Sequence, residues 1–505
     1  MDEINTAAFM PAVLDADAAN KPHFRLKDNI IENKFLKSTR FPILGGSVYN
    51  TTLKSYVGVP FYKTLGFSVL SHRLYEVCIA GVLLLCFQLV INKTLRDRAI
   101  TCIVTSCFAS DPLFIFQTKS QAFSFVFLLA LVFIFYYTLI RVRDFEETPQ
   151  RRAFIVMGLA AGGASITYFT SLATLTIPMG IGLLLAIRKK CVFYLLIPYL
   201  FAVSLFIYGI ASVKIQTPSR LSNLGMPNFA ISAQNRLSES IIDKIVSALS
   251  ELQSYLHTSG PLQHTGVDAL SHTWGKVMIL FLAISIAGLT TCYLIAKRRK
   301  EISQIQNFLF SVGPIFSFLG LSSLFASIHY HHLFSILPFA YLCLGLATSV
   351  IVAIPFFKGS KILKLISLTP PTILLAINML HQNVIDEALE KTGGVGLFNE
   401  RISQIFPLAS SLHPDEQLVF TDWGYHLTYL FVSGGQKNFD VRFAPPSKWL
   451  EQHLKDHERL FACSSAKTAK VLKAELERVG AEKVDQTPIY TRDGSLAYVF
   501  TFSIP

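Results

Sequence analysis

Charged residues are scarce in this sequence. Asp, Glu, Lys and Arg make up 15% of the 505 residues, whereas apolar types make up 51%. An average soluble chain carries about 25% charged residues, so the composition favours lipid as the surrounding solvent. The formal net charge is +12, but the basic residues cluster in short loops between apolar runs. That distribution is typical of membrane topology, and we expect no nucleic-acid partner.

Several motifs of soluble enzymes are also missing. The sequence has no CxxC pair and no Cys/His spacing typical of metal sites, so neither a disulfide framework nor a zinc centre is predicted. GxSxG, P-loop and GxGxxG motifs are absent, so we expect no nucleotide cofactor. The cofactor is otherwise unknown, with a divalent cation as one option. The N-terminus lacks the basic and apolar segments of a signal peptide.

Long apolar runs, in contrast, are frequent. A helical span needs about 20 mostly apolar residues. Ten segments approach this requirement, at 75–91, 99–117, 122–140, 153–168, 171–187, 191–212, 275–296, 307–328, 332–357 and 362–380. The fourth and fifth are short enough to form a hairpin at TYFTS. The sequence therefore predicts an α-helical polytopic membrane protein with ten visible spans, between residues 75 and 380.

The loops between these spans alternate in charge. Five are basic, among them RVRDFEETPQRR (141–152) and KRRK (297–300), and the short loops of the other set hold one Lys and no Arg. Because Lys and Arg remain in the cytoplasm, residues 1–74 and 381–505 are predicted on the outer side of an inner or plasma membrane. Residues 1–74 then require a further span ahead of Met1, and a translocated N-terminal tail is the alternative.

Asp, Glu, Lys and Arg are almost absent from the span centres. Proton- and ion-coupled transporters usually place such groups there, and no inverted hydropathy repeat indicates a secondary transporter. Polar residues gather instead in the outer loops. This arrangement favours an enzyme that acts on a lipid-borne substrate at the outer surface.

The first outer segment carries a distinctive order of residues. It begins with the acidic pair Asp2-Glu3. Within 41–74 there follow, in this order, Tyr49, Leu53, Tyr56, the pair Pro60-Phe61, Gly66, Ser68 and the pair Arg73-Leu74. This order resembles the N-terminal part of the GT-C glycosyltransferases, especially the family 39-like, protein-mannosyltransferase type. Asp111-Pro112 is similar to an acidic-Pro pair in the second outer loop of that family. His331-His332 departs from it, because the family often has Arg-Tyr there.

The resemblance implies a GT-C-like fold and transfer of a sugar, with inversion, from a polyprenyl-phosphate-linked donor. The acceptor would be a lipid, protein or glycan, and membrane lipids would be further partners. Asp2 would be the general base that removes the proton from the acceptor hydroxyl, with Glu3 beside it and Asp111 as a second acid. Substrate contacts are expected from Tyr49, Tyr56, Arg73, Lys119, His331 and His332, and no metal ligand is assigned.

Several of these assignments have a structural alternative. Asp2 and Glu3 could be solvated terminal residues, and Asp111 could be a helix-end acid beside a Pro turn. Arg73 and Lys119 could be anchors at the membrane interface. The aromatic and apolar pattern around Tyr56 predicts short helices on the membrane surface.

Two further regions lie on the predicted outer side. The loop 213–274 contains an apolar stripe at helical spacing over 241–256. Residues 381–505 are more polar, with expected strands at 418–424 and 459–465. A helix at 466–480 is expected to end at Gly480, and a hairpin over 486–504 to turn at Asp493-Gly494.

These elements predict a small C-terminal α/β domain outside the membrane. Asp422 in its DWG stretch is either an acceptor contact, with Trp423 and His426, or a capping residue.

Two alternatives to the transferase remain open from the sequence. One is a transporter or flippase of a lipid-linked glycan, and the other is a non-catalytic membrane protein of GT-C-like fold.

Overall fold

A computed structural model gives the fold of the chain. It describes residues 53–66, 69–95, 97–120, 124–144, 151–167, 170–216, 309–318, 334–353 and 361–393, then 418–422, 439–441, 447–457, 459–490 and 496–504, with a few isolated positions. Predictions for Asp2, Glu3, Tyr49, His331, His332, the span 275–296 and the 241–256 stripe lie outside these residues, apart from single positions in the last two.

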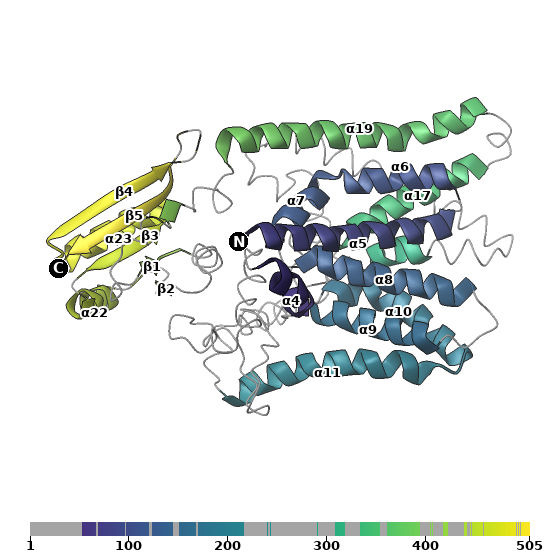
Figure 1. Ribbon diagram of the computed structural model, residues 1–505, viewed down its shortest axis with the longest axis horizontal. Coiled ribbons are helices and arrows are strands. Elements are labelled where there is room, and N and C mark those ends of the chain that lie inside the picture. Colours follow the sequence, from purple (N-terminus) through teal and green to yellow (C-terminus); the bar gives the residue numbers. More distant parts are fainter. Residues whose placement is uncertain are drawn as a thin grey trace.

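A helical bundle and a separate C-terminal sheet make up the described structure (Figure 1). A short helix, α4 (Leu53–Leu65), precedes the bundle. The bundle contains α5 (Val69–Leu95), α6 (Arg98–Ala109), α7 (Pro112–Ser120), α8 (Phe125–Asp144), α9 (Arg151–Thr167), α10 (Thr170–Arg188), α11 (Val192–Gln216), α17 (Leu337–Ala353) and α19 (Lys361–Thr392). Buried aromatic rings join α5, α6 and α8, because Phe87 lies 4.7 Å from Phe108 and 5.3 Å from Phe133 between ring centroids.

The apolar helices identify an integral membrane protein. Among the described residues, four helices are long and apolar enough to cross a membrane, or five if the bent pair α6–α7 counts as one span. Helix α9 ends at Thr167 and α10 begins at Thr170, so the fourth and fifth predicted segments form two helices. The predicted span 99–117 is interrupted, because α6 and α7 meet at an angle of 58°.

Asp111-Pro112 accounts for this break. Two amides of α7 donate to Oδ1 of Asp111, Leu113 N at 2.7 Å and Phe114 N at 3.3 Å. Asp111 therefore caps α7, and Pro is well suited to the first helical position because it has no amide hydrogen to satisfy. Helix α7 then continues from Pro112 to Ser120, beyond the predicted end of the span at residue 117.

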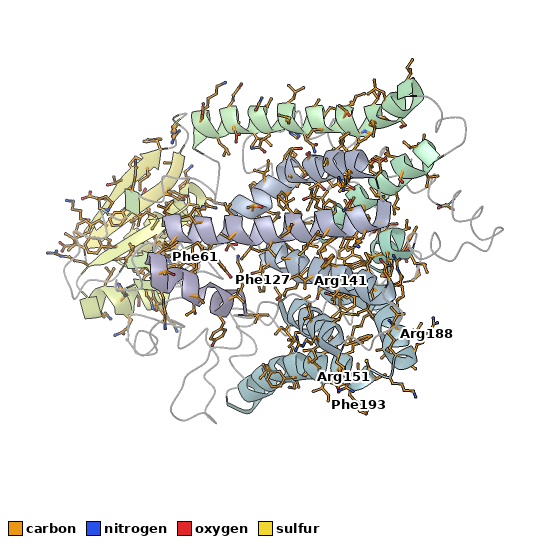
Figure 2. All side chains as sticks on the ribbon, turned by 45° about the vertical axis from the view of Figure 1, so that its right-hand side comes forward. Phe61, Phe127, Arg141, Arg151, Arg188 and Phe193 are labelled. Carbon is orange, nitrogen blue, oxygen red and sulfur yellow. The ribbon has the colours of Figure 1, made fainter. Side chains whose placement is uncertain are left out.

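The two ends of the bundle differ in charge. Helices α4 and α7 and the C-terminal sheet lie toward the same end in Figure 1, which we call the sheet-side end. Basic residues begin or end helices at the opposite end, called here the arginine end, and Figure 2 labels Arg141, Arg151 and Arg188 there. The alternation of basic and non-basic loops along the sequence thus corresponds to two ends of one bundle.

The boundaries of the predicted regions fall inside helices. Helix α5 begins at Val69, before the predicted boundary at residue 74, and α19 continues to Thr392, beyond residue 380. Polar residues at both places end the apolar segments without ending the helices.

Helices α9 and α11 pack closely through glycine. A Cβ atom added to Gly158 would lie 2.3 Å from the carbonyl oxygen of Leu195, and one on Gly162 would lie 2.7 Å from Cβ of Ala202. This small-xxx-small spacing allows two helix backbones to approach each other in a membrane.

The C-terminal region is an α/β domain, as predicted. Its sheet has the order β2-β1-β3-β5-β4, with β1 (Leu418–Phe420), β2 (Phe439–Val441), β3 (Leu460–Ser464), β4 (Lys483–Tyr490) and β5 (Leu496–Ile504). Strand β1 is parallel to both β2 and β3, and β4 and β5 form the expected antiparallel hairpin. Gly480 follows helix α23 (Ala466–Arg478) at φ +86°, which is the left-handed conformation expected of a terminating glycine.

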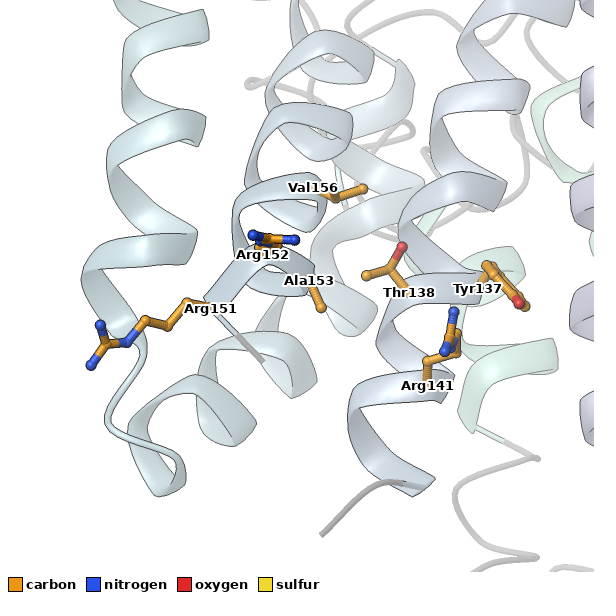
Figure 3. A pocket seen from close by; sticks show the side chains of 7 residues that line it. All are labelled: Tyr137, Thr138, Arg141, Arg151, Arg152, Ala153 and Val156. Carbon is orange, nitrogen blue, oxygen red and sulfur yellow. The ribbon is translucent and has the colours of Figure 1, made fainter. Parts of the chain in front are cut away.

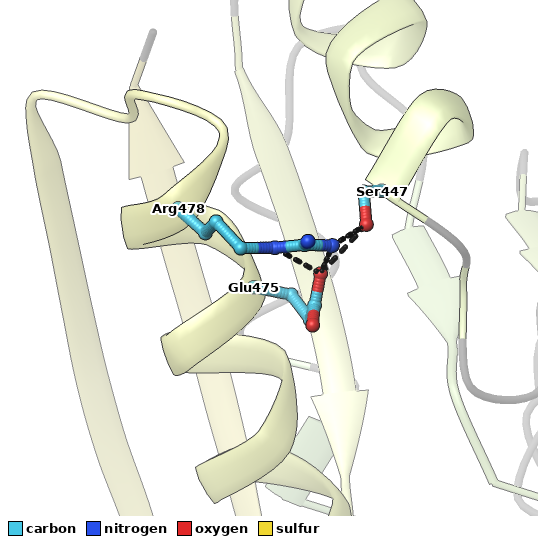
Figure 4. Close-up of polar contacts among 3 residues, drawn as sticks. All are labelled: Ser447, Glu475 and Arg478. Atoms are coloured by element: carbon cyan, nitrogen blue, oxygen red, sulfur yellow. Dashed lines mark hydrogen bonds and ion pairs between the residues drawn. The ribbon is translucent and has the colours of Figure 1, made fainter.

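Two polar contacts order the helices of this domain. Arg478 and Ser447 both bond Glu475, which connects α22 (Ser447–His457) to α23 (Figure 4). Hydrogen bonds from Ser447 and Arg478 lower the pKa of the Glu475 carboxyl. Asp422 accepts from the Ser465 amide at 2.5 Å and the Thr468 hydroxyl at 2.6 Å, so it contributes to the N-terminal cap of α23. Trp423 and His426 lie outside the described residues.

Candidate functional site

A buried ion pair lies where α4 meets α5, at the sheet-side end. Nζ of Lys54 is 2.5 Å from Oε1 of Glu76, and both side chains are at most 2% exposed. Burying a charge is costly unless it is paired. The pair therefore holds α4 against the first turns of α5.

Aromatic and imidazole groups extend this pair into a cluster. His72 lies one turn before Glu76, with Nε2 3.7 Å from Oε1, and its Nδ1 is 2.6 Å from the hydroxyl of Tyr62. Tyr75 donates a 2.6 Å hydrogen bond to the carbonyl oxygen of Lys54. Burial, together with the nearby Glu76 carboxylate, raises the pKa of the Tyr62 phenol well above its usual range. We call Lys54, Tyr62, His72, Tyr75 and Glu76 the α4–α5 cluster.

An apolar groove of about 780 Å³ borders this cluster. Its walls come from α4, α5, α8, α9 and α11, and Leu53 and Tyr75 line the groove next to Lys54 and Glu76. Phe61 and Phe127, two other wall residues, are labelled in Figure 2. On α9 the lining extends from Ile166 to Val156, about 15 Å at a rise of 1.5 Å per residue.

The groove is suited to a hydrocarbon chain. Phe201 is 61% exposed and Leu159 is 49% exposed, although both line it. In a membrane these side chains would face lipid, which allows a lipid chain to enter from the side. The arrangement combines an apolar channel with charged and hydrogen-bonding groups at one end, as an amphipathic lipid requires.

A second buried network surrounds Asp111. Its Oδ2 accepts a 2.6 Å hydrogen bond from the hydroxyl of Tyr341 on α17. Asn378 of α19 donates to the same hydroxyl at 3.1 Å and to the carbonyl oxygen of Cys107 at 2.8 Å. The Asp111 side chain is therefore buried and engaged through both oxygens. These contacts support a role in holding α6, α7, α17 and α19 together, and its action as a second catalytic acid stays a prediction.

The other described candidates lie around the same end. Tyr56 is half-buried on α4, and Arg73 is exposed on the first turns of α5. Lys119 lies in the last turn of α7. Arg73 is next to His72 of the α4–α5 cluster in sequence, whereas Asp111 belongs to the separate network. Among the described residues, the predicted site residues therefore do not form one site.

Lys54, His72 and Glu76 are not among the site residues predicted from the sequence. One signal was available, because His72 and Glu76 are four residues apart near the start of an apolar helix, where an acid needs a partner. The identity of that partner, Lys54, depends on how α4 folds back onto α5. Within the ranges that the structure describes, no group of three or more His, Cys, Asp and Glu side chains could hold a metal ion.

Comparison with known proteins identifies the fold. No family model matches the sequence, and no curated protein matches it. The solved structure of ArnT from Cupriavidus metallidurans bound to undecaprenyl phosphate is similar, with a TM-score of 0.61 and 11% identity over 99% of this chain and 93% of that one. Its apo form gives a TM-score of 0.60 and 12% identity, with the same coverage.

This likeness extends over nearly the whole chain, bundle and C-terminal domain included. At such low identity it establishes a shared fold. The GT-C-like fold predicted from the order of residues in the first outer segment is therefore confirmed.

Proposed function

We propose that this protein is a membrane glycosyltransferase that uses a polyprenyl-phosphate-linked sugar. The observation that carries the proposal is the apolar groove of about 780 Å³ that ends at the buried α4–α5 cluster, in a chain with the fold of ArnT. The solved ArnT structure was bound to undecaprenyl phosphate, which supports a lipid of the same class here.

The groove would hold the first isoprene units of the donor. Aliphatic and aromatic walls remove these units from contact with other lipid chains and orient the head group toward the sheet-side end. Arg73 lies close to that end in sequence and is exposed. It is a candidate to contact the phosphate, together with Tyr56, Lys119 and, outside the described residues, Tyr49, His331 and His332.

The chemistry requires a base and a stabilised leaving group. In the proposed reaction Asp2 accepts the proton of the acceptor hydroxyl while the hydroxyl oxygen attacks the anomeric carbon. The bond from that carbon to the phosphate oxygen breaks, so the configuration inverts and the lipid phosphate leaves. Positive charge near the phosphate stabilises the negative charge that develops on it. Glu3 and Asp111 remain the other candidate acids.

The proposed acceptor is a lipid, protein or glycan on the extracytoplasmic face. The arginine end would face the cytoplasm, because Lys and Arg are retained there. The sheet-side end and the C-terminal domain would then lie outside an inner or plasma membrane. No nucleotide cofactor is expected, and a divalent cation remains an open option.

Thiol labelling tests the lipid site directly. Cys78 lines the groove and is exposed, and Cys102 on α6 is exposed but does not line it. N-ethylmaleimide labelling of the purified protein would be followed at both thiols by peptide mass spectrometry. Undecaprenyl phosphate should slow labelling of Cys78 and leave Cys102 unchanged. Equal rates at Cys78 with and without the lipid would contradict the proposed groove.

A transfer assay tests the catalytic part. Asp2→Asn should abolish sugar transfer while the protein still inserts into the membrane and still protects Cys78 in the presence of lipid. Undiminished transfer would overturn the assignment of Asp2. Lipid protection with no transferase activity in the wild type would favour the transporter alternative.

A further inference from the structure

A second cavity lies at the arginine end of the bundle. It has a volume of about 610 Å³ between the end of α8 and the start of α9, and its lining includes Tyr137, Thr138, Arg141, Arg151 and Arg152. Figure 3 shows Arg141 and Arg152 on the two facing helices, with Thr138 between them. We call this cavity the arginine pocket.

The residues that line this pocket in the described part of the chain carry positive charge. Three of its seven lining residues are arginines, and none of the seven is acidic. The guanidinium of Arg151 stacks 5.3 Å above the ring of Tyr194, and that of Arg141 lies 5.9 Å from the ring of Tyr137. These aromatic contacts orient the two groups and leave their charge in place.

Neighbouring basic residues are engaged differently. Arg143 forms a 2.9 Å ion pair with Asp144, and Lys189 donates a 3.0 Å hydrogen bond to the carbonyl oxygen of Val142. Both contacts lie at the C-terminal end of α8. Arg141, Arg151 and Arg152 differ from Arg143 and Lys189 because all three line one cavity.

One side of the pocket is apolar and continues along the bundle. Ala153 and Val156 complete its lining, and Val156 also lines the apolar groove. The two cavities therefore meet on the surface formed by α8 and α9. A ligand of the arginine pocket can place its charged group between the arginines and its chain along Val156, toward the middle of the membrane.

We propose that the arginine pocket binds the phosphate of an anionic glycerophospholipid from the leaflet at that end. A guanidinium donates two parallel hydrogen bonds to phosphate oxygens, which a lysine cannot do. Basic pockets between transmembrane helices favour anionic head groups over zwitterionic ones. The acyl chain lies along Val156. This site is separate from the α4–α5 cluster and does not depend on the proposed transferase reaction.

The experiment compares lipid binding by the full chain and its variants in detergent. Phosphatidylglycerol binding would be measured by native mass spectrometry for the wild type, for the double variant Arg141→Gln/Arg152→Gln and for the control Arg188→Gln. Arg188 ends α10 at the same end of the bundle but does not line the pocket. The double variant should bind at least about tenfold more weakly, because the loss of even one charge-assisted hydrogen bond has an effect of this size. Arg188→Gln should bind as the wild type does.

Other probes separate the remaining explanations. Phosphatidylcholine should bind equally weakly to all three proteins, and inorganic phosphate should not displace phosphatidylglycerol from the wild type. Equal binding of phosphatidylglycerol by all three proteins would overturn the proposal, and so would an equal loss in Arg188→Gln. Displacement by inorganic phosphate would overturn it in favour of a site for soluble anions. The thermal unfolding temperature of each variant without lipid would verify that it is folded.

Discussion

The hydroxyl of Tyr341 donates a 2.6 Å hydrogen bond to Oδ2 of Asp111, across 230 residues of sequence. The other carboxylate oxygen of Asp111 caps α7. One buried side chain therefore connects the α6–α7 bend to α17, and through Asn378 to α19. The relationship explains how an acid can remain inside a mostly apolar bundle.

Substitutions at this pair should separate a structural role from a catalytic one. Tyr341→Phe removes a hydrogen bond to a buried charged group and should destabilise the protein by about 1.5–3 kcal/mol. Asp111→Asn should destabilise less than Asp111→Ala, since Asn still caps a helix well. Denaturant unfolding in detergent would measure both effects. A folded Asp111→Asn protein with no transferase activity would favour the catalytic assignment.

The Lys54–Glu76 pair should be sensitive to loss of one partner. Glu76→Gln leaves the buried ammonium without its 2.5 Å carboxylate neighbour, and breaking a buried pair in this way costs about 3–5 kcal/mol. Glu387→Gln on the exposed face of α19 is the matched control and should change the unfolding free energy little. If Lys54→Met combined with Glu76→Leu restores most of the stability, the loss comes from the unpaired charge and not from altered packing.

Glycine at position 158 should be required for contact between α9 and α11. Gly158→Ala would place a methyl group 2.3 Å from the Leu195 carbonyl oxygen, and such overpacking costs about 1–3 kcal/mol. Gly180 on α10 has no atom within 4 Å of the corresponding position. Gly180→Ala should leave the unfolding temperature unchanged or raise it, because Ala favours a helix by up to about 1 kcal/mol. Similar unfolding temperatures for the two variants would contradict the close packing.

Glu475 should make the stability of the protein depend on pH. Because hydrogen bonds from Ser447 and Arg478 lower its pKa in the folded state from the ordinary value of 4.5, its contribution is present above pH 4.5 and disappears as the pH falls through the lowered value. The difference in unfolding temperature between the wild type and Glu475→Gln should therefore be present at neutral pH and vanish in acid. Glu477→Gln, on the same helix and more exposed, is the control. A difference that stays constant with pH would show that the effect does not come from ionisation.

Local signals in the sequence determined much of this architecture. Apolar length identified most of the described spans, since only a helix satisfies its own backbone in lipid. The charge of short loops predicted that the two ends of the bundle differ in charge, and Gly480 and the 486–504 hairpin were predicted from turn chemistry. The order of residues in the first outer segment indicated the GT-C fold, while the roles of Asp2 and Glu3 rest on that resemblance.

Only the tertiary structure decided which distant groups meet. Lys54 pairs with Glu76 because α4 folds onto α5. Asp111 accepts a hydrogen bond from Tyr341 at the bend where α7 turns away from α6 by 58°. The apolar groove requires side chains from five helices, and the arginine pocket requires two helix ends to face each other. Periodicity and loop charge report the environment of each residue separately. Which residues contact each other depends on how the helices pack, and local sequence patterns do not indicate that packing.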